Sequence, residues 1–134
     1  ERVYDDGDVL VVSPLSRNSA IIYGFDTTWC SSYIVTNEYF DMYQETGKLF
    51  YIIDTTKPPR DMYGKIFVHV KKDTGKVYLC SANNTILTKN KIYDLQLQLI
   101  SENNIGNISH ILHNQSILNA LKSNCEYLQL KDVS

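Results

Sequence analysis

The hydrophobic positions of this 134-residue chain follow different periods along its length, and each period predicts a type of element. A β-branched run over residues 9–13 predicts a first strand. A short helix is expected to follow from Ser16, a good N-cap, through Ile22, with Gly24 at its C-terminal end. Residues 27–35 are rich in Thr, Trp, Tyr, Ile and Val, which favours a second extended segment.

Residues 36–47 carry the start and stop signals of a helix. Thr36 is a natural N-cap, and Gly47 is expected to close the C-terminal end. The run that follows, Leu49–Asp54, is continuously apolar rather than alternating. Continuous hydrophobicity predicts a central strand that is covered on both faces.

The clearest local signal in the middle of the chain is a β-hairpin. Residues 55–63 contain two consecutive prolines, which cannot lie within a ladder and therefore indicate a loop. The β-runs 65–70 and 76–80 are joined by a polar turn with residues 73–75 at its tip. A short run at 85–88 is expected to extend the hairpin into a meander.

The C-terminal part is predicted to be more helical. Residues 91–102 fit both strand alternation and helix spacing, and we favour a helix. Residues 108–124 have helical periodicity with a break near Asn114, and 126–130 could return as an edge strand. Together these patterns predict an α+β fold. It consists of a mainly antiparallel sheet, a helix between early strands and helices toward the C-terminus, in a single domain over 1–134.

Composition and charge narrow the class of partner. A net charge of -2 gives no electrostatic reason to expect nucleic acid. A central group of basic residues is interleaved with carboxylates, which indicates a solvated face. The group comprises Lys57, Arg60, Lys65, Lys71, Lys72 and Lys76. No apolar run reaches the roughly 18 residues of a membrane span, so no membrane partner is expected. The chain begins with Glu1 rather than Met, so it can be part of a longer polypeptide.

The cysteines and histidines do not form a recognisable metal or disulfide pattern. Cys30, Cys80 and Cys125 are odd in number and widely spaced, so reduced thiols are expected. His110 and His113 are three residues apart, but no third ligand accompanies them. We therefore predict no metal site and no cofactor.

Three residues are candidates for a cleft: Cys30, Asp54 and His69. A nucleophilic cysteine needs a partner that lowers its pKa, and His69 on the predicted hairpin could be that partner. Asp54 ends the apolar strand, a position where functional carboxylates occur. Cys30 directly follows Trp29, however, and packing of that pair in or near the core is the interpretation that we favour.

Tyrosine is unusually abundant, with ten residues in the chain. Several of them fall near the single tryptophan. Such a cluster can line a groove that stacks planar rings, although an aromatic core is the more common outcome. The candidates for this aromatic surface or core are Tyr23, Trp29, Tyr33, Tyr39, Tyr43 and Tyr51.

A series of short motifs occupies residues 9–54. They are Pro14-Leu15-Ser16, Tyr23-Gly24, Thr27-Thr28-Trp29-Cys30-Ser31, Tyr39-Phe40 with Tyr43, and Leu49–Asp54. This order resembles an uncharacterised domain that recurs in proteins of tailed bacteriophages and related mobile elements. The position before Trp29 is often lysine in that pattern, and Thr28 stands there in this chain. The resemblance implies a viral protein located in the virion or in the host cytoplasm, and it carries over no functional residue.

The order of elements also resembles, more weakly, the ADP-ribosyltransferase fold. That resemblance implies a catalytic glutamate on a late strand and a His or Arg on the first strand. Glu102 and Glu126 are the only late glutamates, and neither lies in a matching motif. Ser13 and Pro14 stand near the first-strand position.

The sequence therefore favours an accessory or virion-associated domain that binds another protein, from phage or host, without catalysis. A nucleotide-directed enzyme is the alternative, and it requires Cys30, Asp54 or His69 to converge on a pocket. A nucleic-acid-binding domain is the second alternative, and it requires the central lysines on one face with tyrosines between them.

Overall fold

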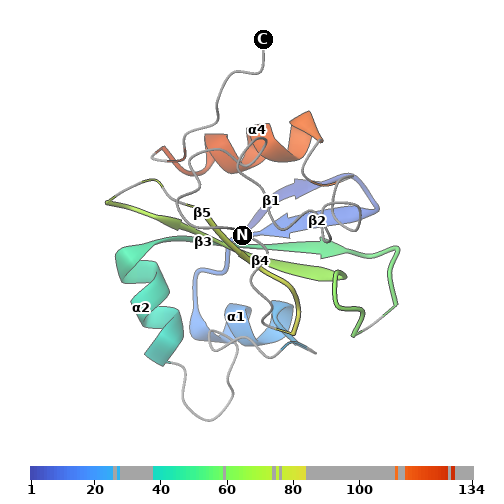
Figure 1. Cartoon of the computed structure of the whole chain (residues 1–134), viewed down its shortest axis with the longest axis horizontal. Coiled ribbons are helices and arrows are strands. Elements are labelled where there is room, and N and C mark those ends of the chain that lie inside the picture. The colour runs from blue at the N-terminus through green and yellow to red at the C-terminus, as the bar shows by residue number, and fades with distance from the viewer. Residues whose placement is uncertain are drawn as a thin grey trace.

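The computed structural model describes residues 1–25, 27, 38–58, 60–73, 75, 77–83, 111, 114–126 and 128. This part of the chain forms an α+β fold, as predicted, with a five-stranded antiparallel sheet and helices packed on it (Figure 1). The strands are β1 (Arg2–Asp5), β2 (Val9–Val12), β3 (Gly47–Asp54), β4 (Lys65–Lys71) and β5 (Val77–Cys80), and they lie in that order across the sheet. The helices are α1 (Arg17–Tyr23), α2 (Glu38–Thr46) and α4 (Gln115–Ser123).

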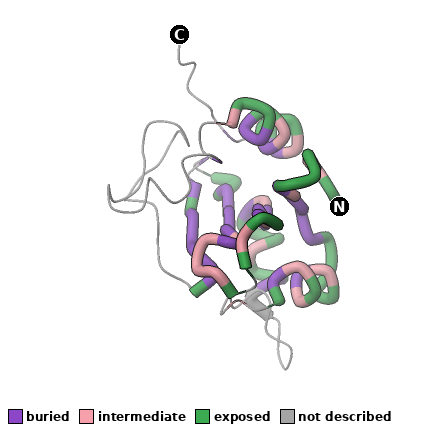
Figure 2. Tube along the Cα trace, turned by 90° about the vertical axis from the view of Figure 1, so that its right-hand side faces the viewer, coloured by how far each residue is buried: buried purple, intermediate pink, exposed green. Residues whose placement is uncertain are grey.

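Strand β3 is the centre of the sheet, and both of its faces are covered. Phe50 and Ile52 point to the face covered by α4, while Leu49 and Tyr51 point to the face covered by α1 and α2 (Figure 1). All four side chains are buried, and Figure 2 shows the buried positions concentrated in the strands. The continuous apolar run therefore correctly predicted a strand covered on both faces.

Both hairpins of the sheet turn at glycines in the left-handed region. Gly7 (φ 92°) lies between β1 and β2, where the Asp6 carboxylate accepts hydrogen bonds from the backbone N–H groups of Asp8 (2.9 Å) and Val9 (2.7 Å). Gly75 (φ 69°) lies between β4 and β5, at the predicted hairpin tip. Strand β1 was not predicted, because its four residues contain no apolar run.

Helix α1 begins at the predicted N-cap, and α4 begins at the predicted break in the helical pattern. The Ser16 side chain accepts a hydrogen bond from the backbone N–H of Ser19, and α1 ends at Gly24. The Asn114 side chain accepts hydrogen bonds from the N–H groups of Ser116 and Ile117 at the start of α4. The predicted break near Asn114 is therefore a helix N-cap.

Gly47 has a different role from the predicted one. It is the first residue of β3, and a Cβ added there would lie 2.0 Å from the backbone oxygen of Val70. The glycine is therefore required by the close approach of two strands.

Several predicted elements lie outside the described residues, namely the Thr36 cap, the extended segment from residue 28 onward, and the elements at 85–88 and 91–102. Glu126 and Leu128 are the two described residues of the predicted edge strand 126–130, and neither lies in a strand. None of the helices described is long and apolar enough to cross a membrane.

Candidate functional site

Asp54 and His69, two of the three predicted cleft residues, do not converge. Asp54 pairs with Val9 at one end of β3, and its side chain shares the face covered by α4. His69 pairs with Leu49, and its side chain lies on the opposite face. The two positions are about 16 Å apart along the sheet, at about 3.3 Å per residue. The third residue, Cys30, lies outside the described residues.

Asp54 closes the turn that follows β3. Its side chain is buried and accepts hydrogen bonds from the backbone N–H of Thr56 (3.0 Å) and from the Thr56 hydroxyl. This contact is typical of an Asx turn, which commonly terminates a strand. Asp54 is the last residue of β3, as the sequence predicts, and a local structural role accounts for these two contacts of its carboxylate.

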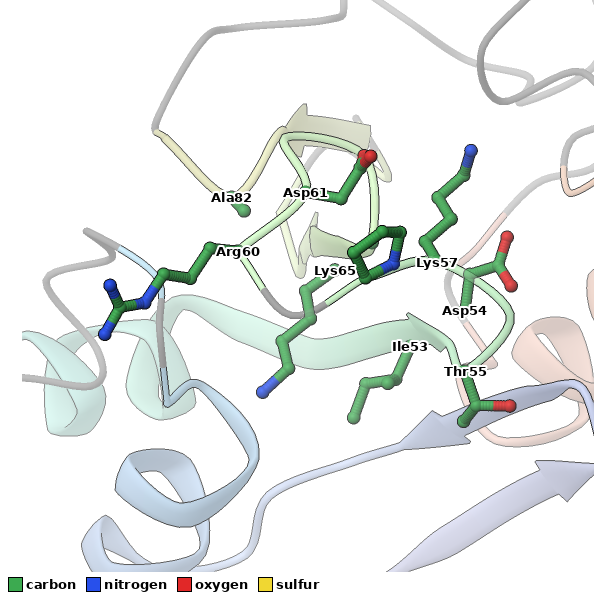
Figure 3. A pocket seen from close by; sticks show the side chains of 10 residues that line it. Ile53, Asp54, Thr55, Lys57, Arg60, Asp61, Lys65 and Ala82 are labelled. Carbon is green, nitrogen blue, oxygen red and sulfur yellow. The ribbon is translucent and has the colours of Figure 1, made fainter.

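A cavity of about 230 Å³ lies next to this turn, and its lining includes Lys57, Arg60 and Lys65 (Figure 3). Figure 3 shows the Arg60 and Lys65 side chains pointing to one side of the pocket and the Lys57 side chain pointing to the other. The Lys65 ammonium donates a hydrogen bond to the backbone oxygen of Phe25 (2.8 Å). Because the three cationic groups diverge, they do not form a single anion site.

A larger groove of about 830 Å³ lies between the C-terminal end of α2 and the β4–β5 hairpin. We call it the aromatic groove. It is lined by Met42, Tyr43, Glu45, Thr46, His69, Lys71, Lys72, Asp73 and Tyr78. Its volume lies within the range of sites that hold small molecules.

His69 is the buried polar side chain of the aromatic groove, with 3% of its surface exposed. Its Nε2 lies 3.0 Å from the backbone oxygen of Tyr43. A carbonyl only accepts, so Nε2 carries the hydrogen and donates it. Tyr43 contributes one of the last carbonyls of α2, which no helical N–H can reach. His69 therefore attaches the C-terminal end of α2 to the sheet.

The same environment favours the neutral form of the imidazole. Burial lowers the pKa of His69, the hydrogen bond to Tyr43 opposes that effect, and the charge of Lys71 lowers the pKa further. In the neutral ring with hydrogen on Nε2, the other nitrogen, Nδ1, is an acceptor. Within the part of the chain that the structure describes, no donor to Nδ1 is present.

Aromatic rings surround His69. The Tyr43 ring meets the imidazole at 4.9 Å between ring centroids in an edge arrangement, and it meets Phe67 at 5.1 Å. Tyr78 on β5 is the cross-strand partner of His69, and its ring lies 6.4 Å from Phe67. Burial raises the pKa of the Tyr78 hydroxyl further above its usual range. Tyr78 was missed from the sequence, although strand pairing within the predicted hairpin could have placed it beside His69.

The other predicted aromatic residues have different environments. Tyr51 is fully buried in the core, and Tyr23 and Tyr43 are partly buried against the same cluster. Tyr39 lies in α2, but its side chain is outside the described residues, as are Trp29 and Tyr33.

The central basic residues are divided between two ends of the sheet. Lys65 and Lys71 occupy opposite ends of β4, about 20 Å apart at about 3.3 Å per residue. Lys57 and Arg60 line the cavity that Lys65 also lines, whereas Lys72 lines the aromatic groove with Lys71. The five that the structure describes therefore do not form one continuous basic surface.

Helix α1 and its flanking residues expose three large apolar side chains. Leu15 is 58% exposed, Ile22 67% and Phe25 62%. Leu15 precedes the N-cap Ser16, Ile22 lies in the last turn of α1, and Phe25 follows the C-cap Gly24. We call these three residues the α1 patch.

The described residues include no cluster of three or more His, Cys, Asp or Glu side chains that could hold a metal ion. Cys80 and Cys125 are buried free thiols. Burial raises the pKa of the Cys80 thiol, which makes it a poor nucleophile. Comparison of the chain with protein-family models, with curated protein sequences and with solved structures gave no match.

Proposed function

We propose that this domain acts by binding another protein through the α1 patch. The observation that carries this proposal is the exposure of Leu15, Ile22 and Phe25 along one short stretch of chain. Single exposed apolar residues are normal on a protein surface. Several large exposed apolar residues within one short segment are a feature of interaction sites.

The orientation of α1 is set by the fold. Ala20 on its inner side is fully buried in the cluster that contains Tyr51 and Phe67. Arg17 forms an ion pair with Asp41 on α2. With its inner side packed in this way, α1 presents Ile22 to solvent.

The energy available from the α1 patch suits a small binding surface. Complete burial of a Leu, Ile or Phe side chain is worth about 1.5–3 kcal/mol, before the costs of association are subtracted. Three such side chains can therefore form the apolar centre of a protein interface.

The α1 patch lies within residues 9–54, the region that resembles a domain of tailed-bacteriophage proteins. We extend the proposal accordingly to an accessory or virion-associated domain whose partner is a phage or host protein. No catalytic step is proposed, since Asp54 and His69 lie on opposite faces of the sheet.

Ile22→Glu tests this function, with Asn119→Glu on the exposed side of α4 as the matched control. Each variant adds one negative charge to an exposed helix position. The immobilised wild-type domain and both variants are used to capture proteins from the cell that produces it. The captured protein is then purified and its affinity for each form is measured by calorimetry.

Wild type and Asn119→Glu should bind the purified partner with equal affinity, and Ile22→Glu should bind at least about tenfold more weakly. A loss of 1.4 kcal/mol corresponds to that factor. Equal binding by all three forms, or no saturable binding by the wild type, would contradict the proposal.

A further inference from the structure

We propose that the aromatic groove is a second binding site, and that it takes a flat, uncharged nitrogen heteroaromatic ring that carries an N–H donor. The site is formed by α2 and the β4–β5 hairpin, so it is separate from the α1 patch. Its ligand class follows from the shape, charge and hydrogen-bonding groups of its lining.

The aromatic groove has apolar side chains on both sides. Tyr43 comes from α2 and Tyr78 from β5, and His69 lies between them as the cross-strand partner of Tyr78. Met42, which is 45% exposed, adds a thioether, and sulfur makes favourable contacts with ring edges. Side chains of these types favour a planar aromatic ligand, which can stack on them or meet them edge to face.

The two walls are held together by hydrogen bonds between α2 and the hairpin. The backbone N–H of Lys72 donates to the backbone oxygen of Thr46 (3.0 Å), and the His69 imidazole donates to that of Tyr43 (3.0 Å). The site is therefore preformed and does not need to close around its ligand.

The charges at the rim balance one another. Lys71 and Lys72 carry two positive charges, and Glu45 and Asp73 carry two negative charges. Neither an anion nor a cation is favoured by this rim, which is why the ligand is expected to be uncharged.

The polar feature that selects among flat rings is His69. The imidazole donates its Nε2 hydrogen to the Tyr43 carbonyl, so Nδ1 is the nitrogen of His69 that can accept a hydrogen bond from a ligand. A ligand N–H satisfies this buried nitrogen, whereas a ring without an N–H leaves it unpaired.

The test is a titration of the ¹⁵N-labelled protein with indole and with 1-methylindole, two rings that differ at the N–H. Saturable amide shifts are expected at residues 42–46, 69–73 and 78. Indole should bind about fivefold more tightly than 1-methylindole, the factor expected for one hydrogen bond. Adenosine, titrated in parallel, distinguishes a nucleobase from an indole as the natural source of the ring, and the tighter binder identifies that source.

Tyr78→Ala should weaken binding by about fivefold or more, as expected from the loss of one stacking partner. Tyr4→Ala, on the opposite edge strand, is the matched control and should bind like the wild type. Met42→Ala, which also removes an exposed part of the groove lining, should weaken binding as well. Equal affinity of indole and 1-methylindole, unchanged affinity in Tyr78→Ala, or shifts outside the groove would overturn the proposal.

Discussion

The two faces of the sheet differ in the side chains that are packed on them. The face under α4 is packed mainly with aliphatic side chains, among them Val68, Leu79 and Ile117. The face under α1 and α2 is aromatic, with Tyr51 and Phe67 in its core and a buried histidine at its margin. Both features proposed for binding, the α1 patch and the aromatic groove, are on this second side.

Packing geometry explains the difference between the faces. Branched aliphatic side chains interdigitate closely and leave little room for another molecule. Rings are larger and meet edge to face, as Tyr43 and Phe67 do. The aromatic groove lies beside these rings, between α2 and the hairpin. We therefore expect substitutions in the aliphatic core to reduce stability most, and substitutions at the exposed positions of the aromatic side to reduce it less.

The largest effect on stability is expected on the aliphatic face. Phe50→Ala removes a fully buried ring from the central strand and should lower the free energy of unfolding by about 3–5 kcal/mol. Tyr78→Ala on the groove side removes a ring that is 37% exposed and should cost less than about 1 kcal/mol. Urea denaturation measures both values, and similar costs would remove the distinction between the faces.

Gly47→Ala should have the next largest effect, a loss of about 1–3 kcal/mol from overpacking. The new methyl group would meet the Val70 oxygen and lie 2.8 Å from Nε2 of His69, so the strand pair and the attachment of α2 must both shift. Gly64→Ala is the control, because its nearest atoms lie at 3.4 Å or beyond. It should stay within about 0.5 kcal/mol of the wild type in the same denaturation experiment. Equal costs for the two variants would show that the close approach at Gly47 is not needed.

Substitutions at the N-caps of α4 and α1 should cause smaller losses of stability on the two sides of the sheet. Asn114→Ala should cost about 1–2 kcal/mol, because its side chain accepts two backbone N–H groups of the helix that covers the aliphatic face. Ser16→Ala should cost about 0.5–1 kcal/mol, because it accepts only one. Thermal unfolding followed by circular dichroism ranks the two variants. The reverse order would mean that α1 contributes more to folding than α4.

Lowering the pH should decrease the free energy of unfolding, because His69 on the aromatic side becomes protonated. The pKa of His69 in the folded protein is lower than the usual value of 6.5. At mildly acidic pH the unfolded chain therefore binds a proton at this residue more readily than the folded protein does, which favours unfolding. The stability from the neutral ring is complete above about pH 6.5 and decreases as the pH falls below that value. His69→Gln keeps an N–H for the Tyr43 carbonyl but does not titrate. The difference in unfolding free energy between wild type and this variant should therefore change between pH 8 and pH 5, and a constant difference would exclude the linkage.

The smallest effect on stability is expected at the α1 patch. Ile22→Ser should change the free energy of unfolding by no more than about 0.5 kcal/mol, because the side chain is exposed. A large loss, measured by urea denaturation, would mean that Ile22 supports the fold rather than a partner.

Local signals in the sequence predicted much of the fold. The continuous run at Leu49–Asp54 identified the central strand, and the cap at Ser16 identified a helix start. At Asn114 the sequence indicated only a break in the helical pattern, which the structure shows to be an N-cap. Each of these signals depends on residues near one another in the chain. Gly47 was assigned to a helix end from its neighbours in the sequence. The contact that requires a glycine there is with Val70, more than twenty residues away in the chain, and local signals cannot reveal it.

The candidate site was harder to predict for the same reason. His69 was identified as a polar residue on an apolar strand, but its contact with the Tyr43 carbonyl depends on how α2 packs on the sheet. Asp54 was grouped with His69, although strand alternation places them on opposite faces once β3 and β4 are paired. The exposure of Ile22 could not be predicted, because an apolar residue in a short helix is expected to be buried.

The most direct test of the division between the two sides is photo-cross-linking from two helices of the intact protein. A benzophenone amino acid is placed at Ile22 on α1 in one variant and at Asn119 on the exposed side of α4 in another. Both variants are irradiated in the cell that produces the protein. One discrete protein adduct is expected from position 22 and none from position 119. Adducts from position 119 alone, or equal yields from both positions, would contradict this expectation.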